Sequence, residues 1–224
     1  MKSIKIKLGI AITYCLLGCA SINAQQYADP EYVKVTENRA AKIVDNMELS
    51  ASVDKQAVVS AIAKQYQNLS KIQEEKEVQI EAVKNSDLSK EKKDKKIEKI
   101  KNVAVKKTDS LHKTYIKELE KYLDEKGVSD VKDGMTYGVM PKTYVAFQDM
   151  LPNLTQEQKD TIYSYLKEAR EHAMDGGSSK EKHAWFGKYK GKINNYLSAQ
   201  GYDLNKESEE WHKRLEARKK ENKE

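Results

Sequence analysis

The chain has 224 residues, with 41 Lys or Arg and 35 Asp or Glu, which gives a formal net charge of +6. Charged residues make up 34% of the chain and hydrophobic residues 38%, and the mean hydropathy is -0.83. These values allow one domain of ordinary size but not two large cores. With only 10 Gly and 3 Pro, a turn-rich β-sandwich or β-barrel is excluded. We therefore expect a very polar helical protein with no membrane span after residue 24.

The first 24 residues have the pattern of a signal peptide. Three lysines precede an apolar run from Leu8 to Gly18, and small residues lead to Ala24. A basic start, a short apolar segment and a small-residue cleavage site are typical of secretory signals. We therefore expect residues 1–24 to be removed after Ala24 and residues 25–224 to form a single exported helical domain, periplasmic or extracellular.

Both cysteines, Cys15 and Cys19, lie inside this segment. The residues that end at Cys19 also resemble a lipobox, so the alternative to cleavage after Ala24 is a lipid anchor at Cys19 and an outer-membrane-associated lipoprotein. Cleavage after Ala24 would leave no cysteine for a disulfide, a nucleophile or a metal. Removal of residues 1–24 takes away three lysines and no acidic residue, which leaves +3. That charge is too small and too dispersed to indicate nucleic-acid binding.

The first half of the chain predicts a long helical hairpin. A first helix is expected from near Thr36 to Met47, followed by a break and an N-cap at Ser52. Two segments within residues 52–126 each carry an apolar stripe with helical spacing. The stripes consist of Val58, Ile62, Leu69, Ile72, Ile80 and Val83, and of Ile97, Ile100, Ala104, Leu111, Tyr115, Leu119 and Tyr122. We expect the two helices to face each other as an antiparallel hairpin that ends near Gly127.

Within the hairpin, the lysine-rich stretch 90–107 predicts a solvated face near the tip. The hairpin also offers a surface for self-association. Residues 127–140 predict an irregular connection because they contain three glycines. Helices are expected at about 141–151, 155–175, 180–199 and 204–220. Most bulky aromatic residues lie between residues 136 and 220, so we expect the compact core to be this small, aromatic-rich helical bundle. The predicted fold class is all-α.

A short motif, Leu154-Thr155-Gln156-Glu157-Gln158, resembles the LTxxQ signature of small periplasmic helical chaperones. The same residues also fit a capping box, in which Thr155 and Gln158 close the first turn of a helix. Ser178 and Glu181 offer the same device. A periplasmic chaperone or scaffold is therefore an alternative function, and it would use the apolar face of the hairpin.

Candidate ligand-binding residues gather in the last third of the chain. Trp185, Tyr189 and Tyr196 fall near one face of a predicted helix, where aromatic rings could stack on a sugar. The polar candidates that could bind hydroxyl groups beside them are Arg170, His183, Asn194 and Asn195. The alternative is that these rings simply form the core. Gly187 and Gly191, four residues apart, predict a close approach of another backbone to this helix.

Catalytic and cofactor motifs do not emerge from the sequence. His172, Asp175 and His183 could be drawn as metal ligands, but they match no common zinc spacing and a Gly-Gly turn separates them. We predict no catalytic residues, no metal site and no cofactor. An accessory polysaccharide-degrading enzyme stays an alternative because paired carboxylates cannot be recognised from spacing alone.

Two stretches carry a family resemblance: TYGVMPKTYVAFQDMLPNLTQEQ (136–158) and EAREHAMDGGSSKEKHAWFGKYKGKINNYLSAQGYDL (168–204). They resemble an uncharacterised domain-of-unknown-function family of exported bacterial helical proteins. The resemblance implies sugar binding and an association with polysaccharide utilisation, but no catalytic residues. Our leading hypothesis is an exported, non-catalytic protein that binds an oligo- or polysaccharide.

Overall fold

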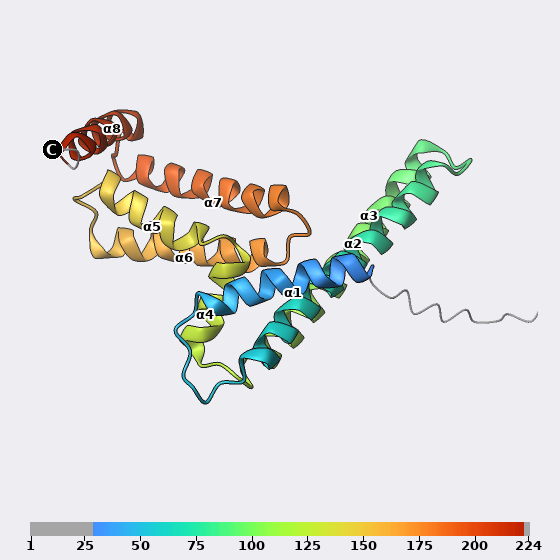
Figure 1. The fold of residues 1–224 in the computed structure, drawn as a ribbon. Coiled ribbons are helices and arrows are strands. Elements are labelled where there is room, and N and C mark those ends of the chain that lie inside the picture. Colours follow the sequence, from blue (N-terminus) through green and yellow to red (C-terminus); the bar gives the residue numbers. More distant parts are fainter. Residues whose placement is uncertain (1–28, 222–224) are drawn as a thin grey trace, which may run out of the picture.

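A computed structural model describes residues 29–221 of the chain. In this range the protein consists of eight helices and no strand, which confirms the all-α prediction (Figure 1). The helices are α1 (Pro30–Asp45), α2 (Lys55–Lys84), α3 (Lys90–Leu119), α4 (Glu125–Met135), α5 (Val139–Met150), α6 (Gln156–Met174), α7 (Ser179–Ala199) and α8 (Leu204–Glu221). Within the described range, none of these helices is long and apolar enough to cross a lipid bilayer. The predicted signal peptide, with Cys15 and Cys19, lies outside the described residues.

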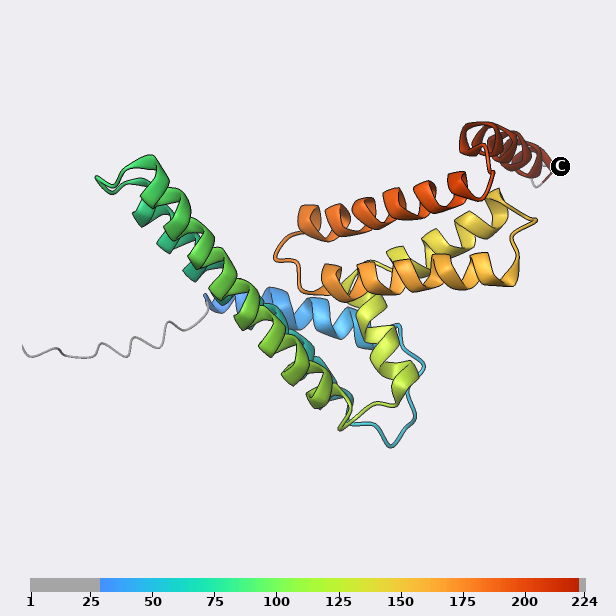
Figure 2. The same cartoon turned by 180° about the vertical axis from the view of Figure 1, so that it is seen from behind.

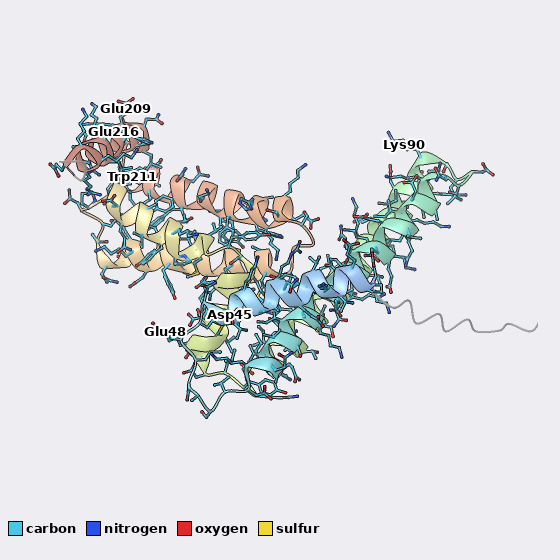
Figure 3. All side chains as sticks on the ribbon, viewed as in Figure 1. Asp45, Glu48, Lys90, Glu209, Trp211 and Glu216 are labelled. Carbon is cyan, nitrogen blue, oxygen red and sulfur yellow. The ribbon has the colours of Figure 1, made fainter. Side chains whose placement is uncertain are left out.

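The long hairpin is formed by α2 and α3, which run antiparallel and pack along their length (Figures 1 and 2). Val58, Ile62 and Leu69 from α2 and Tyr115 and Leu119 from α3 are buried between the hairpin and its neighbours. Toward the tip the side chains become exposed and charged, and Lys90 marks the start of α3 at that end (Figure 3). The apolar stripes therefore bury the base of the hairpin, whereas the tip projects into solvent.

The helix starts in this half differ from the prediction. The first helix begins at Pro30 rather than near Thr36, because Asp29 accepts a hydrogen bond from the Glu31 amide and proline suits the first helical position. The cap of α2 is Asp54, which accepts from the Ala57 amide at 3.0 Å, and not Ser52. At both helices an aspartate just before the first turn sets the start, and for α2 it does so in place of the predicted Ser52.

The segment predicted as irregular, 127–140, contains helix α4 and the first residues of α5, so that prediction is wrong. The hairpin also ends earlier than expected, because α3 stops at Leu119. Gly134 has a packing role in α4: a Cβ at this position would lie 2.6 Å from Cγ2 of Ile43. The glycine thus lets α4 pack directly against α1, which sequence periodicity alone does not reveal.

The buried residues form two clusters rather than one core in the C-terminal half. The first cluster joins the base of the hairpin to α1 and α4 and includes Ile62, Leu119 and Met135. The second lies between α5, α6 and α7 and includes Leu166 and Phe186. The core expected in the aromatic-rich half is therefore present, and the base of the hairpin with α1 and α4 forms a second one that the sequence did not indicate. The two clusters meet at the C-terminal end of α6, where Met174 belongs to the first and Ala173 to the second.

The bundle consists of α5, α6 and α7, with α8 placed across its far end from the hairpin (Figure 2). The N-terminal caps of two of its helices, α6 and α7, match the sequence prediction. Thr155 and Gln158 form a complete capping box on α6, and the Ser178 hydroxyl accepts a hydrogen bond from the Glu181 amide at 3.2 Å on α7. The capping box accounts for the conspicuous residues of the LTxxQ-like motif.

Candidate functional site

A large open cleft, which we call the central cleft, lies where α1, α2 and α4 meet the segments 137–141 and 176–182. Its volume is about 1030 Å³. A cleft of this size can hold a ligand of several rings. The lining residues most relevant to binding are Tyr32, Arg39, Lys42, Glu48, Tyr66, Lys126, Asp130, Tyr137 and Lys182. The residues that line the cleft therefore come from parts of the chain that are far apart in sequence.

Three tyrosines give the central cleft an aromatic lining. Tyr32 and Tyr66 are half-buried, and the Tyr32 hydroxyl donates to the carbonyl oxygen of Tyr66 at 3.5 Å. Burial raises the pKa of Tyr66 to about 12, so its hydroxyl is a neutral donor throughout the physiological range. Tyr137 is 52% exposed and stands at the rim, with its ring 5.9 Å from that of His183. Partly exposed rings with polar groups beside them are typical of sites for ring-shaped polar ligands.

The backbone of Tyr137 is unusual. Its φ is +62°, and among the described residues it is the only non-glycine with positive φ. The left-handed conformation costs an ordinary L-residue roughly 1–2 kcal/mol. Gly138, with φ +64°, follows it, and Lys142 Nζ donates to the Tyr137 carbonyl oxygen at 3.1 Å. Such strain persists where the surroundings enforce it, and it is concentrated at functional sites.

A buried lysine forms part of the opposite wall. Lys182, on the first turn of α7, is 5% exposed, and its Nζ donates to the carbonyl oxygen of Met174 at 3.1 Å. The ammonium also lies 5.8 Å from the centre of the Tyr66 ring. Burial lowers the pKa of Lys182 to about 8, although the nearby Asp175 acts in the opposite direction; Arg39 makes a smaller contribution to the lowering. An anionic group in the cleft would offset this cost and raise that pKa.

The charges around the cleft favour an anionic or strongly polar ligand. Lys126 and Asp130 form an ion pair of 2.7 Å and so neutralise each other. Asp133, a further acid of the lining, pairs with Arg170. Of the remaining charged groups at the cleft, Arg39, Lys42 and the acid Glu48 form no ion pair within the described part of the chain. Together with Lys182, the cleft therefore carries an excess of cationic side chains.

A network of ion pairs lies behind the cleft and holds its walls in place. Asp133, which lines the cleft from α4, is 2.9 Å from Arg170 Nη1, and Lys132 is 2.7 Å from Glu171. The network continues to His112 on α3, whose pKa is raised to about 9 by hydrogen bonds to Asp175 and then Glu171. Burial raises the pKa of Glu171, but hydrogen bonds from His112 and Lys132 outweigh it and lower the pKa to about 2.

One member of this network, Arg170, was a predicted ligand-binding residue. Its side chain is 3% exposed, and besides Asp133 it binds the Ser129 hydroxyl at 2.9 Å. The guanidinium therefore connects α6 to α4 instead of facing solvent. It supports the cleft wall indirectly, through the position of Asp133.

The predicted aromatic residues lie on one flank of α7, and none of them lines the central cleft. Tyr189 is only 2% exposed, whereas Trp185 and Tyr196 are half-buried. The Trp185 ring already stacks on His172, with ring centres 4.3 Å apart, and Lys188 Nζ lies over it at 4.8 Å. Burial, followed by a hydrogen bond to Glu168, raises the pKa of Tyr189 to about 12. These rings mainly contact side chains of α6 and α7 themselves.

The predicted polar residues do not join that aromatic flank. His183 and Asn194 lie on the other flank of α7, with the buried face of Phe186 and Ile193 between the two flanks. His183 is exposed next to Tyr137, and Asn194 lines a smaller pocket near α8. Asn195 is exposed and lines none of the pockets described here. The structure thus divides the seven predicted residues among two flanks of α7 and the interior.

Sequence reasoning did not identify the central cleft or its residues Tyr32, Arg39, Tyr66, Tyr137 and Lys182. Four separate segments build it, and no local motif links them. The single local signal was the Tyr137-Gly138 pair, which is turn-like but does not indicate positive φ at the tyrosine itself. Lys182 lies in a sequence rich in charges, and its burial depends on helix packing that cannot be inferred from composition.

Comparison with known proteins gives a family but no characterised relative. A search of curated proteins finds no match to the chain. The sequence pattern of one family, described as a protein of unknown function (DUF3826), matches residues 33–217. This range includes nearly the whole described structure and every residue named for the central cleft except Tyr32. The chain therefore belongs to the DUF3826 family of proteins of unknown function.

Proposed function

We propose that this protein is an exported, non-catalytic protein that binds carbohydrate, and that the carbohydrate occupies the central cleft. The observation that carries the proposal is the strained, exposed Tyr137 at the rim of the cleft. A tyrosine held at positive φ loses stability that glycine at the same position would regain. A function of the aromatic ring would therefore explain why tyrosine, and not glycine, occupies this position. Sugar rings stack on exposed aromatic faces of this kind.

The remaining lining of the cleft supports this proposal. Sugars offer hydroxyl groups in several directions, and they are bound by side chains with strong hydrogen-bonding groups that flank an aromatic face. Around Tyr137 the cleft supplies the guanidinium of Arg39, the amide of Asn46 and the ammonium of Lys182. The hydroxyl of Tyr66 adds a further donor from the floor.

The signal-peptide pattern and the resemblance to exported proteins of polysaccharide utilisation support a proposal of binding outside the cytoplasm. The protein would bind oligosaccharides released from a polysaccharide, without cleaving them. The capping box explains the LTxxQ-like residues as a helix start, so they add no support to a chaperone function.

The proposal is tested with residues 25–224 on a glycan array, followed by isothermal titration calorimetry with the glycans that bind. Replacement of Tyr137 with Ala should lower affinity for such a glycan at least about tenfold, because stacking on the ring is lost. The matched control is Tyr163→Ala, since Tyr163 is also an exposed tyrosine, 44% exposed, but lies outside the cleft. No glycan binding, or an equal effect of both variants, would overturn the proposal.

A further inference from the structure

One flank of α7 begins at the central cleft and continues as an exposed strip along the bundle, which we call the track. Ser179, His183, Gly187, Lys190 and Asn194 follow one another at intervals of three or four residues, so they share one side of the helix. Ser179 lines the central cleft, and Asn194 lines a second pocket. At 1.5 Å per residue, these two positions are roughly 22 Å apart along the axis.

Two glycines, Gly187 and Gly191, leave gaps between the side chains on the exposed side of α7. A Cβ built at Gly187 or at Gly191 meets no atom within 4 Å. The predicted close approach of another backbone is therefore wrong: space, and not a neighbouring helix, lies over these glycines. Glycine in a helix interior lowers the stability by about 1 kcal/mol relative to alanine, and packing does not explain its presence here. A ligand that passes over the helix and needs this space would explain it.

The second pocket, which we call the α8 pocket, lies between α5, α7 and α8 and has a volume of about 500 Å³. An indole and several hydrogen-bonding side chains face it, again the combination suited to a sugar ring. Its lining includes Trp211, Asn194, Asn205, Ser208, Lys142 and Lys190. Asn194, a predicted ligand-binding residue, lines this pocket together with Trp211 of α8.

The indole of the α8 pocket is held in place by hydrogen bonds within the protein itself. Trp211 Nε1 donates to Asp149 Oδ2 at 2.7 Å, and Arg218 binds both carboxylate oxygens of Asp149 at 2.9 Å. Figure 3 shows Trp211 on the side of α8 turned toward the bundle. A ring held in this way loses little conformational entropy when a ligand stacks on it.

The central cleft and the α8 pocket are connected through Lys142. Its side chain lines the α8 pocket, while its Nζ donates to the carbonyl oxygen of Tyr137 at the rim of the cleft. His183 continues the connection on α7, because its ring lies 5.9 Å from that of Tyr137. A chain-like ligand leaving the cleft past Tyr137 would therefore be led along His183 and Gly187 toward Trp211.

Charge along this path indicates the chemical class of the ligand. Among the described residues that line the α8 pocket, two are lysines and none is acidic. The central cleft adds Arg39, Lys42 and Lys182 against one acid without an ion pair among the described residues, Glu48. A neutral sugar chain would not need this series of cations, whereas a chain with a carboxylate on successive sugar units would pair with them.

We propose, on the basis of the carbohydrate-binding function above, that the ligand is an acidic oligosaccharide that extends from the central cleft across Gly187 to the α8 pocket. The ligand is thus a uronic-acid chain long enough to reach Trp211, and not a single sugar. Short oligomers occupy the central cleft alone.

The test uses oligomers of galacturonic acid as the probe, a dimer and a hexamer, with a neutral galactose hexamer for comparison. In a Trp185→Phe variant, Trp211 is the single remaining tryptophan, so the intrinsic fluorescence reports on the α8 pocket. The acidic hexamer should change this fluorescence and the dimer should not. The neutral hexamer should bind at least about tenfold more weakly than the acidic one.

A second variant tests the path without relying on fluorescence. Gly187→Leu places a side chain on the track in space that is empty in the folded protein, so the helix should form normally. It should lower affinity for the acidic hexamer about tenfold in calorimetry and leave the dimer unchanged. The matched control is Asn195→Leu, which adds the same side chain to α7 at an exposed position outside the pocket linings.

The outcomes separate this inference from the proposed function. If dimer and hexamer bind equally and Gly187→Leu has no effect, the extended track is wrong while the central cleft still binds sugar. If the neutral hexamer binds as well as the acidic one, the ligand class is wrong. If neither acidic oligomer binds but another glycan on the array does, this inference is wrong while the proposed carbohydrate binding stands. Failure of every glycan overturns the proposed function as well.

Discussion

His112 of α3 lies 2.8 Å from Asp175, which follows the last residue of α6, between Nδ1 and Oδ2. A second contact, 3.5 Å from Nε2 to Glu171, engages the other side of the same ring. The hairpin is thereby tied to the bundle through a histidine that carries a positive charge at neutral pH. The connection extends to α4, a helix that lines the central cleft, because Glu171 also binds Lys132.

We expect the stability contributed by His112 to depend on pH. Its pKa is raised to about 9 in the folded protein, against about 6.5 in the unfolded chain. The contribution is therefore complete below about pH 6.5 and is lost as pH rises through about 9. His112→Gln should lower the free energy of unfolding on the order of 2 kcal/mol near pH 6 and much less near pH 9.5. Urea denaturation at both pH values measures this. An equal loss at both would show that the imidazolium does not pair with the carboxylates.

Lys182 should have the opposite pH dependence. Burial lowers its pKa to about 8 from an ordinary value of 10.5. Between these values the unfolded chain binds more protons, so the free energy of unfolding rises with pH across this window. Lys182→Met should therefore stabilise the protein by about 1–2 kcal/mol near pH 7, after allowing for the lost hydrogen bond to Met174.

The advantage of the methionine variant should shrink as pH rises above about 8, because the wild-type lysine then loses its charge. Chemical denaturation of both proteins near pH 7 and near pH 9.5 provides the comparison. A constant difference would mean that the folded protein does not perturb Lys182. Binding of an acidic oligosaccharide near pH 8 should also take up protons, visible as a dependence of the binding heat on the buffer.

The strained backbone at Tyr137 predicts an ordering of two variants. Glycine tolerates its φ of +62°, whereas alanine retains the steric cost, and both lack the ring. Tyr137→Gly should therefore be more stable than Tyr137→Ala by about 1 kcal/mol, even though glycine usually destabilises. Thermal and urea unfolding of the pair measure the difference. An alanine variant as stable as the glycine variant would indicate an ordinary backbone at this residue in solution.

Two helical glycines should respond in opposite ways to the same substitution. Gly134→Ala places a Cβ 2.6 Å from Cγ2 of Ile43, so α1 and α4 must move apart at a cost of about 1–3 kcal/mol. Gly187→Ala meets nothing and should stabilise the protein by about 0.5–1 kcal/mol through helix propensity. The melting temperature should fall in the Gly134→Ala variant and rise in the Gly187→Ala variant. Equal shifts would contradict the different surroundings described for the two glycines.

Local chemistry made part of this fold predictable. The capping box of Thr155 and Gln158, the Ser178 cap and the paired apolar stripes of the hairpin all depend on residues close in sequence or on regular spacing. Helix α4 was missed because its glycines resemble a loop, and the reason for Gly134 is the distant Ile43.

The candidate site was less predictable for the same reason. The aromatic residues of α7 were conspicuous in the sequence, but helix packing turns Tyr189 inward and seats Trp185 against His172. The central cleft instead brings Tyr32, Tyr66 and Lys182 together from α1, α2 and α7. Only tertiary contacts produce that combination, so sequence spacing could not reveal it.

The most direct test is a crystal structure of residues 25–224 with a bound oligosaccharide that calorimetry has shown to bind. We expect a sugar ring against the Tyr137 side chain, with its polar groups within hydrogen-bonding distance of Lys182 or Arg39. A sugar seated on the Trp185 flank of α7, with nothing bound in the central cleft, would contradict the location proposed for the site.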